Sequence, residues 1–296
     1  IPTGLAARIR LGLQQGHRPA LWEGGGQALG LVALLVAVQC DAGVPGLLIA
    51  ALAPPLIVQG LHLVSLLGRT AAWLRPRAAE LQTDHAGPVW RSGLLFLVIQ
   101  AATAIAWSFD AVFCSHLHGP AAAGDLAVMQ RLFVVPTVLL QLALTPLWPA
   151  YGEALSRGDV DWVRRTWMRS LLATLAAGLL LIIGGPLLVP PMLSVWMGPA
   201  YPTDAGLILA CAASVAAMSL AHAASMLANG AGRLAFQAWC GVALLLATLL
   251  VKPILGLWLG PAGLPWATAV CAAACLVVPL IMLGGRSTAA PPRQTP

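Results

Sequence analysis

Four ionisable side chains, Asp110, Asp125, Arg131 and Lys252, lie in or at the ends of long apolar stretches of this sequence. At the centre of a membrane-crossing helix each such group costs about 2.5–3.5 kcal/mol, so each is expected to face protein, water or an interface. An arginine or a lysine held there can bind the oxygens of a phosphate, and a guanidinium can do so through two parallel hydrogen bonds. A carboxylate held there can carry a proton or compensate a cation.

Arg131 is expected near the middle of a membrane. Its apolar stretch begins near Ala121, which puts Arg131 about 15 Å deep at 1.5 Å per helical residue, within a hydrocarbon core about 30 Å thick. Two roles remain open for it: an anionic ligand, or an internal ion pair with Asp110. Asp125 is a poor partner for Arg131, because their spacing along a helix puts the two side chains about 120° apart.

The other three residues each have a structural and a functional interpretation. Asp110 and Asp125 flank a short turn, and Asp125 at a helix start is stabilised by the helix dipole. Asp110 lies deeper and can carry a proton or pair with Arg131. Lys252 precedes Pro253, about 10 Å from the end of its stretch; it either extends outward to water or lines a cavity.

The elements that position these residues are expected to be membrane-crossing helices. The chain is 59% hydrophobic and 9% charged, with a mean hydropathy of +0.85, whereas soluble domains average roughly 25% charged residues. Apolar stretches recur at the length of about 20 residues that a crossing helix needs. The sequence therefore predicts an all-α integral membrane protein with eight transmembrane helices, over residues 20–39, 44–67, 92–113, 121–147, 167–196, 203–228, 234–259 and 264–283.

The basic residues predict the orientation of these helices. All of the 16 Lys and Arg residues except Arg131 and Lys252 fall in or directly beside every second connecting segment, or at the two ends of the sequence. By the positive-inside rule these segments and both ends are cytoplasmic. The densest charge is in 145–166, a cytoplasmic loop whose arginines face anionic lipid. The net charge of +6 therefore requires no nucleic acid partner.

Several other classes of site are not expected. The six cysteines lie in or beside apolar stretches and are interpreted as small packing residues, not disulfides. No metal site and no cofactor are expected. The outer loops are only a few residues long, whereas a membrane polysaccharide polymerase, ligase or acyltransferase needs a large outer loop with catalytic residues. The chain is therefore not expected to be an enzyme.

The stretch 108–165 resembles the polysaccharide flippases of the multidrug/oligosaccharidyl-lipid/polysaccharide exporter superfamily. Members often have an acid near the end of one helix, a short outer turn, a next helix with a central arginine, then P-x-x-P-A-x-x-E-A and G-D followed by arginines. The matching positions here are Asp110, Arg131, Pro146, Pro149, Ala150, Glu153, Ala154, Gly158, Asp159, Arg164 and Arg165.

The resemblance implies a fold of two six-helix lobes that enclose a cavity open alternately to each side of the membrane. On this mapping, residues 1–67 end the N-terminal lobe, 68–91 form a cytoplasmic linker between lobes, 92–285 form the C-terminal lobe, and 286–296 form a cytoplasmic tail. The front of the N-terminal lobe would be missing, so the sequence is interpreted as truncated at its N-terminus, where it begins with Ile1.

The resemblance also implies a function. The chain is expected to belong to a flippase that carries a lipid-linked (undecaprenyl diphosphate) oligosaccharide, of the O-antigen type, across the bacterial inner membrane. Arg131 and Lys252 are the candidate cargo-binding residues, and Asp110 and Asp125 are candidates for coupling or charge pairing. The expected partners are the lipid-linked oligosaccharide, membrane lipids and other polysaccharide-assembly proteins. The alternative is a cation-coupled drug or metabolite antiporter of the same superfamily.

Overall fold

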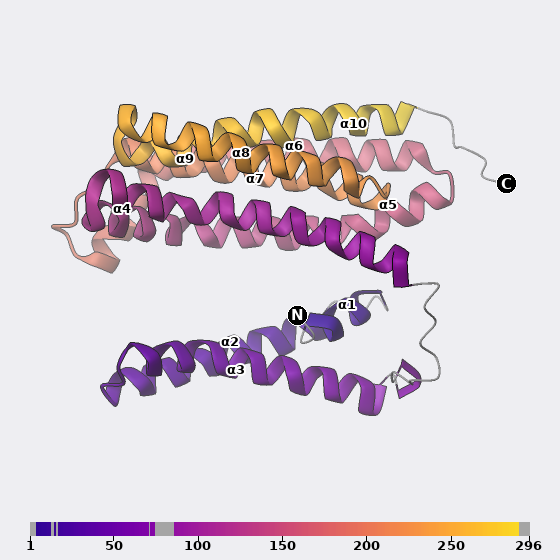
Figure 1. The fold of residues 1–296 in the computed structure, drawn as a ribbon, viewed down its shortest axis with the longest axis horizontal. Helices are drawn as coiled ribbons and strands as arrows, with labels where there is room; N and C mark the ends of the chain where they lie inside the picture. The colour runs from indigo at the N-terminus through magenta and orange to yellow at the C-terminus, as the bar shows by residue number, and fades with distance from the viewer. Residues whose placement is uncertain (1–3, 13–14, 16, 71, 75–85, 290–296) are drawn as a thin grey trace. The chain divides into compact units, whose positions relative to one another are not determined.

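The computed structural model describes residues 4–12, 15, 17–70, 72–74 and 86–289. Within these residues the chain is helical and contains no strand, which confirms the predicted all-α class (Figure 1). The chain divides into two compact units, 1–84 and 85–296. The predicted linker 68–91 contains this division, and part of it, 75–85, lies outside the described residues, as does the end of the predicted tail, 290–296.

The first unit is a pair of long helices with a short helix beside it. Its elements are α1 (Leu5–Gly12), α2 (His17–Gln39), α3 (Val44–Ser65), a π-helical turn η2 (Leu66–Thr70) and a 3₁₀ turn η3 (Ala72–Leu74). Helices α2 and α3 approach closely where Gly26 and Gly30 face Pro55, and a Cβ on Gly26 would lie 3.2 Å from the Pro55 Cα. Arg10 of α1 is buried and its Nε donates to His62 Nε2 at 2.9 Å. This bond ties α1 to α3.

The second unit is a bundle of long helices (Figure 1). Its elements are α4 (Ala86–Leu144), α5 (Leu147–Ser156), α6 (Val160–Met197), α7 (Ala205–Gly230), α8 (Leu234–Leu259), a 3₁₀ turn η6 (Gly260–Ala262), α9 (Gly263–Ala272), a π-helical turn η7 (Ala273–Val277) and α10 (Val278–Ala289).

Glycines mark the sharp reversals in this unit. The backbone of α4 leaves the helical conformation at Gly119, with φ 88° and ψ 169°, a region that only glycine adopts without strain. Gly260, which ends α8 and is the first residue of η6, has φ 66° and ψ −155°. His118 contacts the Gly256 carbonyl oxygen at 3.0 Å, so both reversals lie at the same end of the unit.

Six helical stretches among the described residues are long and apolar enough to cross a membrane. Their bounds are Arg18–Gln39, Val44–Gly68, Trp90–Ser156, Val160–Met197, Ala205–Gly230 and Leu234–Gly285. The predicted count of eight is therefore not confirmed as it stands. The difference arises in the third and sixth stretches, which are 67 and 52 residues long. Each contains two of the predicted spans and one of the glycine reversals.

Helix α7 is the most buried of the six stretches. Its side chains are mainly Ala, Ser and other small groups, which let neighbouring helices approach closely. A Cβ on Gly178 of α6 would lie 2.8 Å from the Ala216 Cβ, and one on Gly185 would lie 3.2 Å from Ile208. The core is therefore built around α7.

The connection from α5 to α6 contains Gly158 and Asp159, the G-D pair of the sequence pattern. Gly158 has φ 78°, and the next residue, Asp159, accepts a hydrogen bond from the Trp162 backbone N–H at 3.1 Å. Asp159 thus caps the N-terminus of α6. Glu153 and Arg157 form an exposed ion pair one helical turn apart. Gly158 and Asp159 therefore have a local structural role: they lie between the end of α5 and the start of α6.

Candidate functional site

A buried ion pair joins α4 to α8 in the second unit. The Lys252 ammonium lies 2.6 Å from Asp110 Oδ1, and the two side chains are 0% and 2% exposed. Lys252 Nζ also donates to the backbone carbonyl oxygen of Ala106, one turn before Asp110 on α4. Lys252 therefore does not extend outward to water, which was one of its two sequence-based interpretations.

Gln130 completes this cluster from the other half of α4. Its Nε2 donates to Asp110 Oδ2 at 2.9 Å, so each carboxylate oxygen has a polar neighbour. Charged groups buried in an apolar interior are tolerated when they are paired and hydrogen-bonded. The cluster Asp110–Lys252–Gln130 satisfies this condition.

The cluster lies deep in the helices that carry it. At 1.5 Å per residue, Asp110 is roughly 13 Å from the Gly119 reversal, and Lys252 is roughly 12 Å from Gly260. Both reversals lie at one end of the unit, so the two estimates agree. If this end is near a membrane surface, the ion pair lies inside the hydrocarbon core.

Arg131 follows Gln130 directly but is exposed on α4. Because successive helical residues point about 100° apart, Gln130 faces Asp110 while Arg131 faces another direction. Among the described residues no ion pair joins Arg131 to Asp110; the carboxylate is held by Lys252 instead. The structure therefore brings together two of the four candidate residues, Asp110 and Lys252, and places Arg131 beside them on a separate face.

Asp125 lies apart from this cluster and is exposed. Its Oδ1 accepts a hydrogen bond from the Tyr201 hydroxyl at 2.6 Å, in the loop between α6 and α7. Asp125 thus fastens this loop to the second half of α4. The contact favours the structural interpretation of Asp125 over a role in coupling.

The Asp125–Tyr201 bond predicts a specific pH dependence. Burial, the hydrogen bond to Asp125 and its negative charge raise the pKa of Tyr201 to about 12, against about 10 in an unfolded chain. The folded state holds this proton longer, so the stability that the bond contributes is present below about pH 10 and is lost as the pH rises toward 12. In absorbance titration at 295 nm, the rise near pH 12 should be smaller in Tyr201→Phe than in the wild type by the contribution of one tyrosinate. A normal pKa for Tyr201 would contradict the bond.

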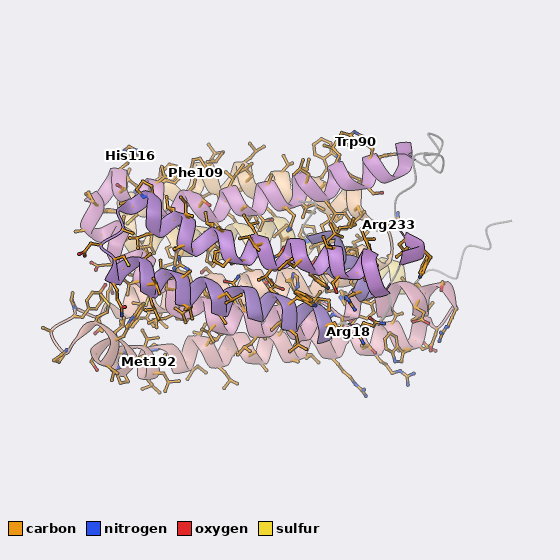
Figure 2. The ribbon with its side chains drawn as sticks, turned by 90° about the horizontal axis from the view of Figure 1, so that it is seen from below. Arg18, Trp90, Phe109, His116, Met192 and Arg233 are labelled. Atoms are coloured by element: carbon orange, nitrogen blue, oxygen red, sulfur yellow. The ribbon has the colours of Figure 1, made fainter. Side chains whose placement is uncertain are left out.

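The ends of the second unit differ in the residues they carry. His116 and Met192 lie at one end, and Trp90 and Arg233 lie at the other (Figure 2). The first turn of α4 and the last turn of α10 also lie at the Arg233 end (Figure 1). Arg233, and Arg91 directly after Trp90, are two of the basic residues that the sequence assigns to one side of the membrane, and both lie at this end.

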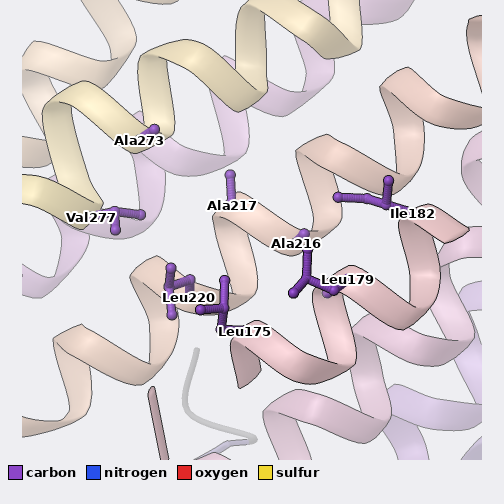
Figure 3. A pocket seen from close by; sticks show the side chains of 9 residues that line it. Leu175, Leu179, Ile182, Ala216, Ala217, Leu220, Ala273 and Val277 are labelled. Carbon is purple, nitrogen blue, oxygen red and sulfur yellow. The ribbon is translucent and has the colours of Figure 1, made fainter. Parts of the chain in front are cut away.

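A groove lies elsewhere on this unit, between α6, α7 and η7 (Figure 3). It has a volume of about 170 Å³, and its walls are entirely aliphatic. No group of three or more His, Cys, Asp or Glu residues among the described residues could hold a metal ion.

Gln130 and Tyr201 were not identified from the sequence. The position of Gln130 gave one usable signal. Gln130 lies almost as far after Gly119 as Asp110 lies before Gly119, so a reversal of the chain at Gly119 places Gln130 and Asp110 side by side. Tyr201 gave no such signal, because its partner Asp125 is on a distant helix.

Comparison of the chain with family models, curated proteins and solved structures finds no match. The function of the chain is therefore inferred from its residues and their geometry.

Proposed function

We propose that this chain is part of a membrane transporter that flips a lipid-linked oligosaccharide with an anionic diphosphate across a bacterial inner membrane. The observation that carries the proposal is the buried Asp110–Lys252 pair. Ionisable groups in membrane-crossing helices are costly, and where they occur they usually belong to a transport pathway or a proton relay.

The proposal includes a topology. The helical stretches Trp90–Ser156 and Leu234–Gly285 each cross the membrane twice, turning at Gly119 and at Gly260, which gives eight crossings. The Arg233 end of the second unit is cytoplasmic by the positive-inside rule. The first unit supplies the last two helices of one lobe, and the second unit is the other lobe.

Arg131 is the proposed anion-binding residue at the exposed surface of α4, and buried Lys252 joins it only when its pair with Asp110 opens. Arg131 is exposed on α4 and can donate two parallel N–H hydrogen bonds to phosphate oxygens. Lys252 is paired with Asp110, so a diphosphate that approached it would compete with this carboxylate. Asp110 then either keeps Gln130 as its hydrogen-bond donor or takes up a proton. Binding of the cargo and release of Asp110 from Lys252 are thereby linked.

Arg131→Ala is expected to abolish most of this activity. The test is complementation: the full gene product that contains this chain is expressed in a bacterium lacking its own O-antigen flippase, and surface polysaccharide is measured. Loss of a charged hydrogen bond to the cargo should reduce the polysaccharide about tenfold or more, and Arg131→Lys should retain part of it, since the positive charge remains. Arg157→Ala, which removes another exposed arginine, is the matched control.

The membrane content of each variant is measured by immunoblot, because only a loss at normal protein level bears on the cargo site. Full activity of Arg131→Ala would overturn the role of Arg131. A wild-type protein that restores no polysaccharide but confers proton-dependent resistance to cationic drugs would favour the antiporter, for which the buried Asp110 is the supporting observation.

A further inference from the structure

The groove between α6, α7 and η7 is formed by small residues at a helix contact (Figure 3). Gly178 lies against Ala216 with no room for a side chain, and Ala217 and Ala273 continue the floor. Ala273 and Val277 of the π-helical turn η7 also line the groove. The result is a small apolar groove, also lined by the exposed side chains of Leu175 and Leu179.

An exposed apolar ridge leads from this groove toward the N-terminus of α6. Met168, Leu172, Leu175 and Leu179 are all exposed large apolar side chains. They recur at intervals of four and three residues, so they share one face of the helix. The last two of them also line the groove, which makes the ridge and the groove one continuous surface.

Two arginines stand at the other end of the ridge. Arg165 and Arg169 are exposed and four residues apart, so they lie on the same helix face as Met168 and Leu172. Like charges at this spacing destabilise a helix slightly, and an anion between them would offset that repulsion. Arg165 Nε donates to the Asp161 backbone carbonyl at 3.3 Å. The Asp161 side chain is an acidic neighbour that any such anion would meet.

The distance between the arginines and the groove matches one leaflet. Leu179 lies about 15 Å beyond Arg169 along α6, at 1.5 Å per residue. Half of the hydrocarbon core is also about 15 Å. A phospholipid with its phosphate at the level of Arg165 and Arg169 would therefore have its chain end at the groove.

We propose that this surface is a binding site for an anionic phospholipid of the cytoplasmic leaflet. The phosphate lies between Arg165 and Arg169, and one acyl chain follows Leu172 and Leu175 into the groove. The two arginines at one end of this surface favour a lipid as the occupant over another transmembrane helix, because an apolar helix carries no phosphate to bind them. The site rests on the membrane placement proposed above and is independent of the cargo.

The test uses the purified full gene product, stripped of lipid in detergent and titrated with dioleoyl phosphatidylglycerol or dioleoyl phosphatidylcholine in native mass spectrometry. Phosphatidylglycerol is expected to bind more tightly. The double variant Arg165→Gln/Arg169→Gln should weaken phosphatidylglycerol about 30-fold, from the contribution of two basic residues near a membrane surface, and leave phosphatidylcholine unchanged. Ala273→Phe, which fills the groove from an exposed position, should weaken both lipids.

Two matched controls accompany these variants. Arg233→Gln removes an exposed arginine at the start of a different helix, α8, and Ala104→Phe adds the same bulk at an exposed position of α4; neither should change lipid affinity. Equal affinity for the two lipids, or phosphatidylglycerol binding unaffected by Ala273→Phe, would overturn the site. So would a dimer of the chain that is lost in Ala273→Phe, because a second helix would then occupy the groove. If only the complementation test of the proposed flippase function failed, the proposed lipid site would not be contradicted.

Discussion

Lys252→Met is expected to destabilise the second unit by about 3–5 kcal/mol, the cost of removing one partner of a buried ion pair. The variant leaves the Asp110 carboxylate buried, with only Gln130 beside it. It also removes the donor to the Ala106 carbonyl oxygen. Thermal melting of the purified protein in detergent measures the loss. Leu250→Met, at an exposed position of the same helix, is the control for the new side chain and should melt like the wild type.

The double variant Lys252→Met/Asp110→Leu separates the ion pair from the packing around it. Replacing both charges by apolar groups of similar volume is often neutral or stabilising, so the double variant should recover most of the stability lost in Lys252→Met. Under the proposed function it should still fail in complementation. A Lys252→Met protein that melts like the wild type would refute the buried pair. A double variant with full polysaccharide export would refute its part in transport.

Gly263→Ala is expected to destabilise the reversal between α8 and α9 by about 3 kcal/mol or more, beyond the usual range for an overpacked site. A Cβ at this position would lie 1.9 Å from the Leu255 carbonyl oxygen and 2.8 Å from the Gly256 backbone nitrogen. Both are main-chain atoms of α8, so no side-chain rotation relieves the clash. The first turn of α9 would have to move away from the end of α8.

Gly124→Ala is the matched control for this substitution. A Cβ on Gly124 meets nothing within 4 Å, and in a helix alanine is preferred over glycine by about 1 kcal/mol. Gly124→Ala should therefore melt at or slightly above the wild-type temperature, and Gly263→Ala well below it. Equal melting of the two variants would show that α9 does not begin as closely against α8 as described.

The helical class was predictable from the sequence, because long apolar stretches of low charge leave few alternatives. The short turn between Asp110 and Asp125 was also anticipated, and the structure reverses the chain there at Gly119. The number of separate helices was less predictable. A chain that reverses at a single glycine continues its helical turns on both sides, and 67 residues then form one stretch.

The pairing of charges could not be predicted from spacing. Which face of an apolar helix turns inward depends on its periodicity, and α4 and α8 are apolar on nearly every side. The depth of Arg131 along its helix followed from counting residues. Its exposure and the contact of Gln130 with Asp110 depend on how α4 is rotated about its own axis. The burial of Lys252 depends on the packing of α8 against α4, which no local pattern encodes.

The link between α4 and α8 has a consequence for how the protein is made. Asp110 emerges from the ribosome about 140 residues before Lys252, which at roughly 5–20 residues per second is a delay of about 7–28 s. Under the proposed membrane topology, the helix that carries Asp110 inserts before its cationic partner has been synthesised. Gln130 follows Asp110 by only 20 residues. We therefore expect the Gln130 amide to bind the Asp110 carboxyl group already in the nascent hairpin, before α8 is made.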